Sequence, residues 1–174
     1  QQGGWGFSNA GLIASGGATL LVDTLYDLKL TERMLAEMRR VVPAAARIDT
    51  LVNTHANGDH CWGNQLVQAG RIVSSRATAE EMLELSPRLM ATLVSAARLI
   101  ARAPAPIRGA LRLLGRLGVP RLGPLTESAE FVVDAFGAFE FDKVSLTLPT
   151  ETFSGSLALT LGDCPVELIE VGPA

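Results

Sequence analysis

The sequence has 174 residues, of which 48% are hydrophobic and 19% are charged, and its formal net charge is −3. These values exclude an intrinsically disordered chain and disfavour nucleic-acid binding, because material for an apolar core is ample and no basic excess can neutralise phosphates. No run approaches the ~20 apolar residues of a membrane-spanning helix, no secretion signal is visible, and two cysteines give no disulfide framework, so we expect a cytoplasmic protein.

The first 75 residues alternate between strand-like and helix-like patterns. Gly16 and Gly17 join two apolar runs as a hairpin turn, and apolar residues recur at helical spacing from the expected N-cap, Thr31, up to a stop at Pro43. The expected elements are strands at 8–14 and 18–23, a helix at 31–42, a strand at 48–53, a helix at 64–68 and a strand at 71–74. This order is typical of the α/β class, with a layered sheet and helices.

Residues 77–122 break this rhythm, and we expect them to form a helical insertion. The predicted helices lie at 77–85, 87–103 and 107–117, and strand patterning returns at 143–148, 157–161 and 166–171. The sequence therefore predicts a single, partial domain over residues 1–174 that is interrupted by the insertion.

The insertion is basic: seven arginines and no acidic residue lie between Glu84 and Glu127. One interpretation is a solvated basic face over an ordinary packed apolar face, or a dimer contact. A second is a lid that gives an apolar acyl or polyketide-like substrate a channel, with arginines that attract an anionic handle. A third, which the sequence favours least, is a basic amphipathic helix that lies on a membrane surface.

The segment most informative about chemistry is 53–60, Asn-Thr-His-Ala-Asn-Gly-Asp-His, which contains both histidines of the chain, His55 and His60. It follows the predicted buried strand 48–53, so its side chains should converge at a sheet edge, where open α/β folds bind ligands. Imidazole and carboxylate together suit zinc or another borderline divalent metal. The alternative is that the two histidines only cap a turn rich in Asn, Gly and Asp.

The spacing His55-x-Asn57-x-Asp59-His60 resembles the His-x-His-x-Asp-His signature of the metallo-β-lactamase superfamily, with Asn57 at the second histidine. The segments 9–23, 49–55 and 167–173, and the residues just after the metal loop, are similar to that family as well. The resemblance implies an αββα sandwich, present here in part and with the helical insertion added. It also implies a metal-dependent hydrolase.

For the site, the resemblance implies one or two zinc ions, with iron or manganese as alternatives. His55 would serve the first metal, with Asn57 at the position of its second ligand, and Asp59 and His60 would serve the second. Asp59 would also act as the catalytic residue that orients the attacking water, whose pKa a bound metal lowers towards ~7. Asp23 would support the metal loop, as the corresponding acid of the family does; the alternative is a plain turn acid.

Two departures from the family pattern limit this site. Asn57 offers a neutral amide, whereas zinc prefers imidazole or thiolate. The family's third histidine would come just after Ala174, and the abrupt ending leads us to expect a piece of a longer polypeptide. Because zinc normally takes three or four ligands, we expect this chain alone to bind zinc weakly or not at all. Cys61, expected as a small packing residue, would change this only if its thiolate turned inward.

The resemblance favours a thioesterase-like or lactonase-like hydrolase, in which metal-activated water attacks an ester, thioester or lactone with an apolar acyl part. A related alternative is a metal-dependent cyclase of the polyketide type. The alternative from another class is a non-catalytic, metal-poor relative whose insertion mediates dimerisation or partner binding. We expect no nucleic-acid partner, membrane contact is disfavoured, and a homodimer through the insertion stays open.

Overall fold

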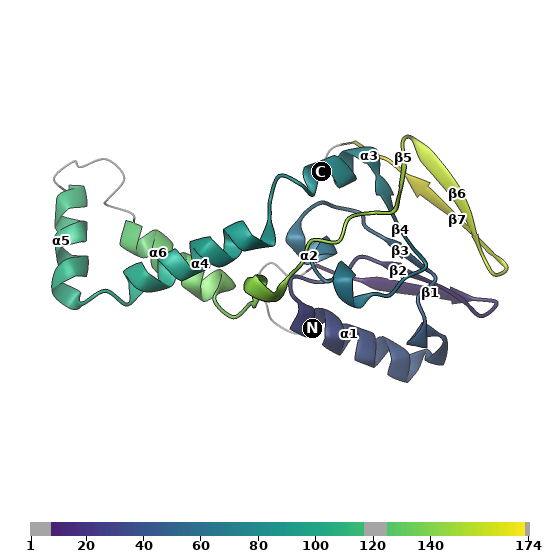
Figure 1. Ribbon diagram of the computed structural model, residues 1–174, viewed down its shortest axis with the longest axis horizontal. Coiled ribbons are helices and arrows are strands. Elements are labelled where there is room, and N and C mark those ends of the chain that lie inside the picture. The colour runs from purple at the N-terminus through teal and green to yellow at the C-terminus, as the bar shows by residue number, and fades with distance from the viewer. Residues whose placement is uncertain (1–7, 117–124, 173–174) are drawn as a thin grey trace. The chain divides into compact units, whose positions relative to one another are not determined.

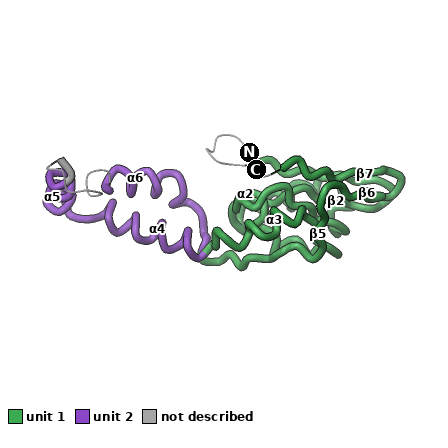
Figure 2. Tube along the Cα trace, turned by 90° about the horizontal axis from the view of Figure 1, so that it is seen from above, with its two compact units in different colours: residues 1–87, 142–174 green, residues 88–141 purple. Residues whose placement is uncertain are grey.

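The structure is a computed structural model that describes residues 8–116 and 125–172. It separates into two compact units, one formed by residues 1–87 and 142–174 and the other by residues 88–141 (Figure 2). The first unit is built on β-sheets, and the second consists of helices.

The main sheet has five strands in the order β1-β2-β3-β4-β5 (Figure 1). They are β1 (Gly11–Ser15), β2 (Ala18–Val22), β3 (Thr50–Val52), β4 (Arg71–Ser75) and β5 (Glu151–Phe153). β1 and β2 are antiparallel, and the turn between them needs the positive φ angles of Gly16 and Gly17, 55° and 82°; all later pairs are parallel. A separate antiparallel hairpin follows, formed by β6 (Ser156–Leu161) and β7 (Cys164–Ile169).

Different elements cover the two faces of the main sheet, because side chains alternate along each strand. Leu21, Leu51 and Ile72 pair across neighbouring strands and pack against Leu35 of α1 (Leu28–Val41). On the other face, residues of β2, β3 and β4 pack against Leu159 of β6. The unit is thus layered as helix, sheet and hairpin, which confirms the predicted α/β class.

Helix α1 begins one turn earlier than the sequence predicts. Asp27 is its N-cap, since the carboxylate accepts a hydrogen bond from the backbone N of Leu30 at 2.9 Å. The prediction of Thr31 as the cap is wrong: Thr31 lies inside the helix, and its buried hydroxyl accepts from the backbone N of Leu25 at 3.2 Å. Asp27 directly precedes the first turn, so its carboxylate can accept from the free backbone N–H groups of that turn, whereas Thr31 comes too late in the sequence to do so.

The strand predicted at 143–148 is also wrong. Within the described residues this segment joins no sheet, and strand β5 begins only at residue 151. Side chains hold its backbone instead: Ser145 N donates to Gln65 Oε1 at 2.5 Å, and Asn64 Nδ2 donates to the carbonyl of Thr147 at 3.0 Å. The alternation of leucine with polar residues therefore marks an extended connection.

The short helices are η1 (Pro43–Ala46), α2 (Gly58–Cys61), η2 (Asn64–Leu66), α3 (Arg76–Glu81) and η3 (Phe141–Lys143).

The helical unit contains α4 (Pro87–Ala101), α5 (Ala105–Arg116) and α6 (Leu125–Phe136). Val94, Ala97 and Ala129 are buried in it, and Arg98 donates to the carbonyl of Gly137 at 2.6 Å. The helices predicted within 77–122 correspond to α3, α4 and α5, whereas α6 was not predicted. Residues 117–122 lie outside the described residues, and the role of the insertion as a lid stays a prediction.

Candidate functional site

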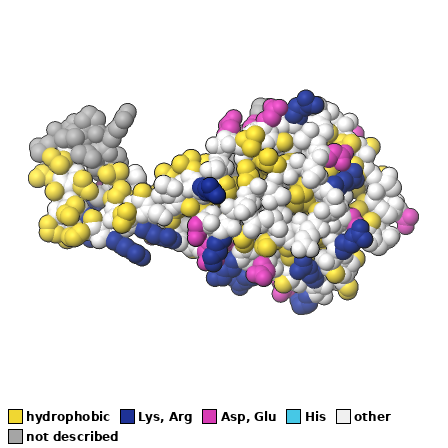
Figure 3. Space-filling view, viewed as in Figure 1, with side chains coloured by type: hydrophobic (Ala, Val, Ile, Leu, Met, Phe, Trp, Pro, Cys, Tyr) yellow, Lys and Arg dark blue, Asp and Glu magenta, His cyan; other side chains and the backbone are white. Residues whose placement is uncertain are grey.

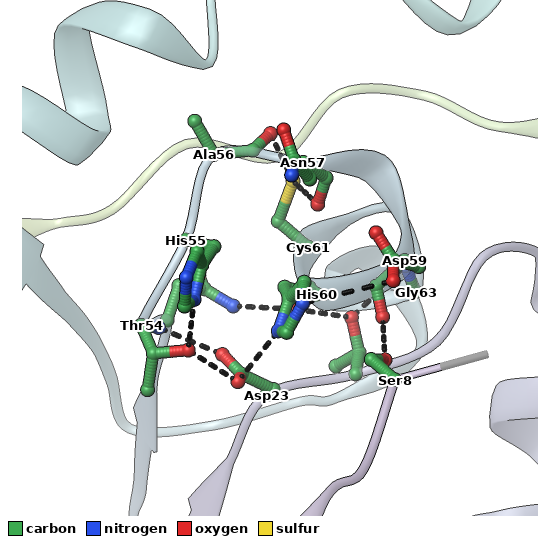
Figure 4. A network of polar contacts seen from close by, with 12 residues as sticks. Ser8, Asp23, Thr54, His55, Ala56, Asn57, Asp59, His60, Cys61 and Gly63 are labelled. Atoms are coloured by element: carbon green, nitrogen blue, oxygen red, sulfur yellow. Dashed lines mark hydrogen bonds and ion pairs between the residues drawn. The ribbon is translucent and has the colours of Figure 1, made fainter. Parts of the chain in front are cut away.

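The candidate site lies at the carboxyl ends of β2 and β3 (Figure 4). Sheet pairing continues one residue past each strand: Asp23 N donates to the carbonyl of Val52 at 2.8 Å, and Asn53 N donates to that of Val73 at 2.9 Å. The segments that follow the two strands therefore start side by side, although Asp23 and Thr54 are 31 residues apart in the sequence. Open α/β sheets bind ligands at this edge.

Asp23 is the centre of the polar network in the site. It is only 3% exposed and has a φ of 61°, a left-handed conformation that aspartate tolerates better than most residues. Its Oδ1 accepts from Thr54 N at 2.7 Å, and its Oδ2 accepts from Thr54 Oγ1 at 2.5 Å and from His60 Nδ1 at 2.8 Å. One carboxylate thus joins the loop after β3 to helix α2.

These hydrogen bonds decide which nitrogen of each neutral histidine is free. A carboxylate only accepts, so His60 Nδ1 carries the proton that it donates to Asp23, and His60 Nε2 keeps its lone pair. The hydroxyl of Thr54 donates its hydrogen bond to Asp23, so Thr54 Oγ1 accepts from His55 Nδ1 at 2.9 Å. His55 Nε2 therefore keeps its lone pair as well. The ring centroids of the two histidines are 4.5 Å apart. Asp23 therefore prepares two neighbouring imidazoles to act as ligands through Nε2.

Asp59 brings a second carboxylate to the same place. Its Oδ2 lies 3.6 Å from His60 Nε2, and Ser8 Oγ donates a hydrogen bond to its backbone carbonyl. Burial by itself lowers the pKa of His60, but the hydrogen bond to Asp23 and the negative charges of Asp23 and Asp59 together raise that pKa above its usual value. The two carboxylates therefore favour a cation at this position.

Asn57 and Cys61 do not join this group. Figure 4 shows Asn57 beside Ala56 and the Cys61 thiol, away from the two imidazole rings. Cys61 Sγ donates to the carbonyls of Ala56 and Asn57 at 3.3 and 3.4 Å, and the side chain is fully buried. Burial, assisted by the charges of Asp23 and Asp59, raises the pKa of this thiol to about 12, so it stays protonated at neutral pH. This environment fits the packing role expected for Cys61.

Buried polar residues that the sequence pattern did not single out support the loop. The carbonyl of His60 accepts from Thr24 N at 2.8 Å and from Asn53 Nδ2 at 3.0 Å. The amides of Asn53 and Asn64 exchange two hydrogen bonds, at 2.8 and 3.1 Å. Thr54, which links Asp23 to His55, was missed as well. The one signal that could have found them is their position, because Thr24, Asn53 and Thr54 come at or just after the ends of predicted strands.

The side chains at this site are of the types that bind a borderline divalent metal, but too few of them come together to complete a metal site. The two imidazoles and the carboxylate of Asp59 are ligand types that zinc takes. Within residues 8–116 and 125–172, however, no group of three or more His, Cys, Asp or Glu side chains could hold a metal ion. Stable zinc sites in proteins use three or four such ligands. The described residues by themselves therefore form an incomplete metal centre.

Comparisons with known proteins place this arrangement in a family context. The family model described as "Metallo-beta-lactamase superfamily" matches residues 3–156. Among solved structures, the chain is similar to metallo-β-lactamases from Hirschia baltica (21% identity, TM-score 0.37, covering 42% of this chain and 33% of that chain), Pontibacter korlensis (23%, 0.36, 42% and 34%) and Erythrobacter litoralis (24%, 0.35, 42% and 32%). The chain thus spans about a third of the length of these structures. No curated protein sequence matches it.

Proposed function

Because the chain belongs to the metallo-β-lactamase superfamily, we propose that it contributes to the active site of a metal-dependent hydrolase. One observation carries the proposal: a single buried carboxylate, Asp23, leaves Nε2 of both His55 and His60 free to bind an ion. Carboxylates in this position orient ligand imidazoles before the ion arrives. Asp59, 3.6 Å from His60 Nε2, adds a carboxylate that can orient a water or accept its proton.

The proposed substrate is an ester, thioester or lactone with an apolar acyl part. These three compounds share a carbonyl carbon that water attacks during hydrolysis, and the family signature around His55 and His60 supports this class. Zinc is the proposed metal, with iron or manganese as alternatives, because imidazole and carboxylate bind all three. Further ligands have to be added to the described set before the metal centre is complete.

Metal binding and hydrolysis measured on matched variants test the proposal. Calorimetric titration with Zn²⁺, Fe²⁺ and Mn²⁺ is combined with assays on a p-nitrophenyl ester, an acyl thioester and a lactone, and both are carried out on this chain and on a longer polypeptide that contains it. His60→Ala and Asp59→Ala should lose metal binding and hydrolysis together. Asp163→Ala, an exposed carboxylate in the turn between β6 and β7, should change neither. Hydrolysis by His60→Ala at the rate of the unmodified chain would contradict the proposal.

A non-catalytic, metal-poor relative is the second candidate function. Two observations favour it: no complete ligand group is found among the described residues, and an amide replaces an imidazole at Asn57. The same titrations separate the candidates. A longer polypeptide that contains this chain and that binds no metal and hydrolyses none of the three substrates supports the non-catalytic candidate, and it does so more strongly if Asn57→His gains zinc binding.

A further inference from the structure

A cavity of about 250 Å³ lies in the sheet-based unit, apart from the candidate metal site. It is lined by residues of α1, of η1 and η2, and of the segments that follow these two short helices. Those segments lead into the amino ends of β3 and β4, whereas His55 and His60 follow the carboxyl end of β3. The cavity is therefore at the opposite end of the strands from the two histidines.

The wall of the cavity next to the core is apolar. Leu35, Ile48 and Val67 line it, and each is at most 6% exposed because it packs in the core on the helix side of the main sheet. Ala46 lines the cavity as well, but it is exposed and its side chain is small. The cavity has room for about eight water molecules at ~30 Å³ each, and it is smaller than the ~300–1,000 Å³ of drug-sized sites. An occupant therefore has to be a small molecule.

Two arginines line the cavity, and no acidic side chain does. Arg39 makes no side-chain hydrogen bond or ion pair with the described residues. Arg47 has its Nε 3.2 Å from Asp49 Oδ1, but its side chain is 83% exposed and its two terminal nitrogens stay available as donors. Figure 3 shows lysine and arginine side chains on the lower part of this unit, where α1 lies in the same view. The cavity therefore attracts an anion.

A backbone donor of the cavity also lacks an acceptor. The backbone N of Ile48 donates no hydrogen bond to the described residues, although Ile48 is only 5% exposed. Both neighbours in the chain are paired: Arg47 N donates to the carbonyl of Ala44 at 3.3 Å, and Asp49 N donates to that of Thr19 at 3.2 Å. Buried backbone N–H groups nearly always have an acceptor. The Ile48 N–H therefore indicates an acceptor that the described residues do not supply.

We propose that this cavity binds the phosphate group of a small phosphate ester. At neutral pH such a group carries about 1.5–2 negative charges and has three acceptor oxygens, one for each of the three donors. Arginine matches phosphate oxygens with paired N–H groups. A carboxylate fits less well, because it has a single charge and two oxygens. The site does not depend on the proposed hydrolase, since none of its residues belongs to the candidate metal site.

NMR titration of the whole chain with inorganic phosphate and with glycerol 3-phosphate tests this inference. In ¹H–¹⁵N spectra the backbone signals of Arg47, Ile48 and Gln68 should shift with both compounds, and uncharged glycerol should shift none of them. Arg39→Gln and Arg47→Gln should each raise the dissociation constant about five-fold, because charged hydrogen bonds at exposed side chains are of modest strength. Ala46→Phe changes an exposed position and fills the cavity, so it should abolish binding. Unchanged binding by Ala46→Phe would overturn the inference.

Arg40→Gln is the matched control for Arg39→Gln. Arg40 also belongs to the last turn of α1, where a cation interacts favourably with the helix dipole, but it pairs with Glu37 at 2.9 Å and does not line the cavity. Its replacement should leave phosphate binding unchanged, and circular dichroism confirms that every variant is folded. Three further results would overturn the inference: no shift of the cavity signals in the folded chain, equal losses in Arg39→Gln and Arg40→Gln, or shifts confined to the signals of His55 and His60.

Discussion

Replacing Asp23 by asparagine tests whether one carboxylate orients both histidines. Asparagine keeps the size of the side chain and also tolerates the φ of 61°, so the backbone should be preserved. Its amide oxygen can still accept from Thr54 N. Its NH₂ group, however, replaces Oδ2 and faces two donors, Thr54 Oγ1–H and His60 Nδ1–H. Asp23→Asn therefore removes both hydrogen bonds to the charged Oδ2, and the contact with His60 can re-form only as a neutral hydrogen bond, when the His60 proton moves to Nε2 and Nδ1 accepts from the amide.

The magnitude follows from these two bonds. Each hydrogen bond to a charged acceptor contributes about 1.5–3 kcal/mol, so their gross loss is about 3–6 kcal/mol. Part of this is offset, because the variant no longer has to bury a charge at a site only 3% exposed. We expect the free energy of unfolding to fall by about 2–4 kcal/mol. We also expect metal affinity to fall about 10- to 100-fold, because the imidazoles are no longer oriented.

Two measurements check this prediction. Urea unfolding gives the change in stability, and long-range ¹H–¹⁵N NMR spectra report the tautomer of each histidine, with only two histidines to assign. At a pH above the raised pKa of His60, both rings of the unmodified chain should carry the proton on Nδ1, and in Asp23→Asn His60 should gain the Nε2–H form. Asp27→Asn is the control, because it changes another buried aspartate, the cap of α1, away from the histidines. An Asp23→Asn chain with an unchanged His60 tautomer and stability within about 0.5 kcal/mol of the unmodified chain refutes the reasoning.

Three further predictions concern the surroundings of the site. In the native protein a thiol reagent should label Cys164 and spare Cys61, because burial raises the pKa of the Cys61 thiol to about 12. In urea the reagent should label both cysteines. Rapid labelling of two thiols in the native protein would contradict the burial of Cys61. Gly63→Ala should destabilise the fold by about 3 kcal/mol or more, because the new Cβ would lie 2.0 Å from a buried threonine hydroxyl of α1. Gly109→Ala is the control: its new Cβ would have nothing within 4 Å, so it should stabilise α5 by up to about 1 kcal/mol. Equal stabilities of the two variants in urea unfolding would disprove the close packing around Gly63. In metal-free protein, the pKa of His60 is higher in the folded state than in the unfolded state, so protonation of His60 stabilises the fold below pH ~6.5. This stabilisation is lost as the pH rises through the pKa that His60 has in the folded state. A His60→Gln variant whose free energy of unfolding has the same pH dependence would contradict this prediction.

Local patterns in the sequence were sufficient for much of the fold. Glycine pairs, apolar periodicity and prolines act within a few residues, so the four strands and the long helix α1 of the first 75 residues were predicted with the correct type and order. The short helices η1 and α2 were not predicted, and the helix expected at 64–68 is the 3₁₀ helix η2. The candidate residues were equally local, because His55, Asp59 and His60 fall within six positions after a buried strand. The family resemblance also depended on this short segment, and the match over residues 3–156 confirms it.

Partnerships between distant segments were decided only by the tertiary structure. Asp23 and His60 are 37 residues apart, and they meet because β2 and β3 pair in parallel with Leu21 opposite Leu51. That register depends on burial of whole sheet faces, which no local pattern encodes. The same reason explains the failure at 143–148, since alternation makes a strand only where another strand pairs with it. The sequence therefore determined which residues could carry the chemistry, and the resemblance already pointed to Asp23 as support for the metal loop. The packing of the sheet determined which atoms this carboxylate contacts, namely Thr54 N, Thr54 Oγ1 and His60 Nδ1.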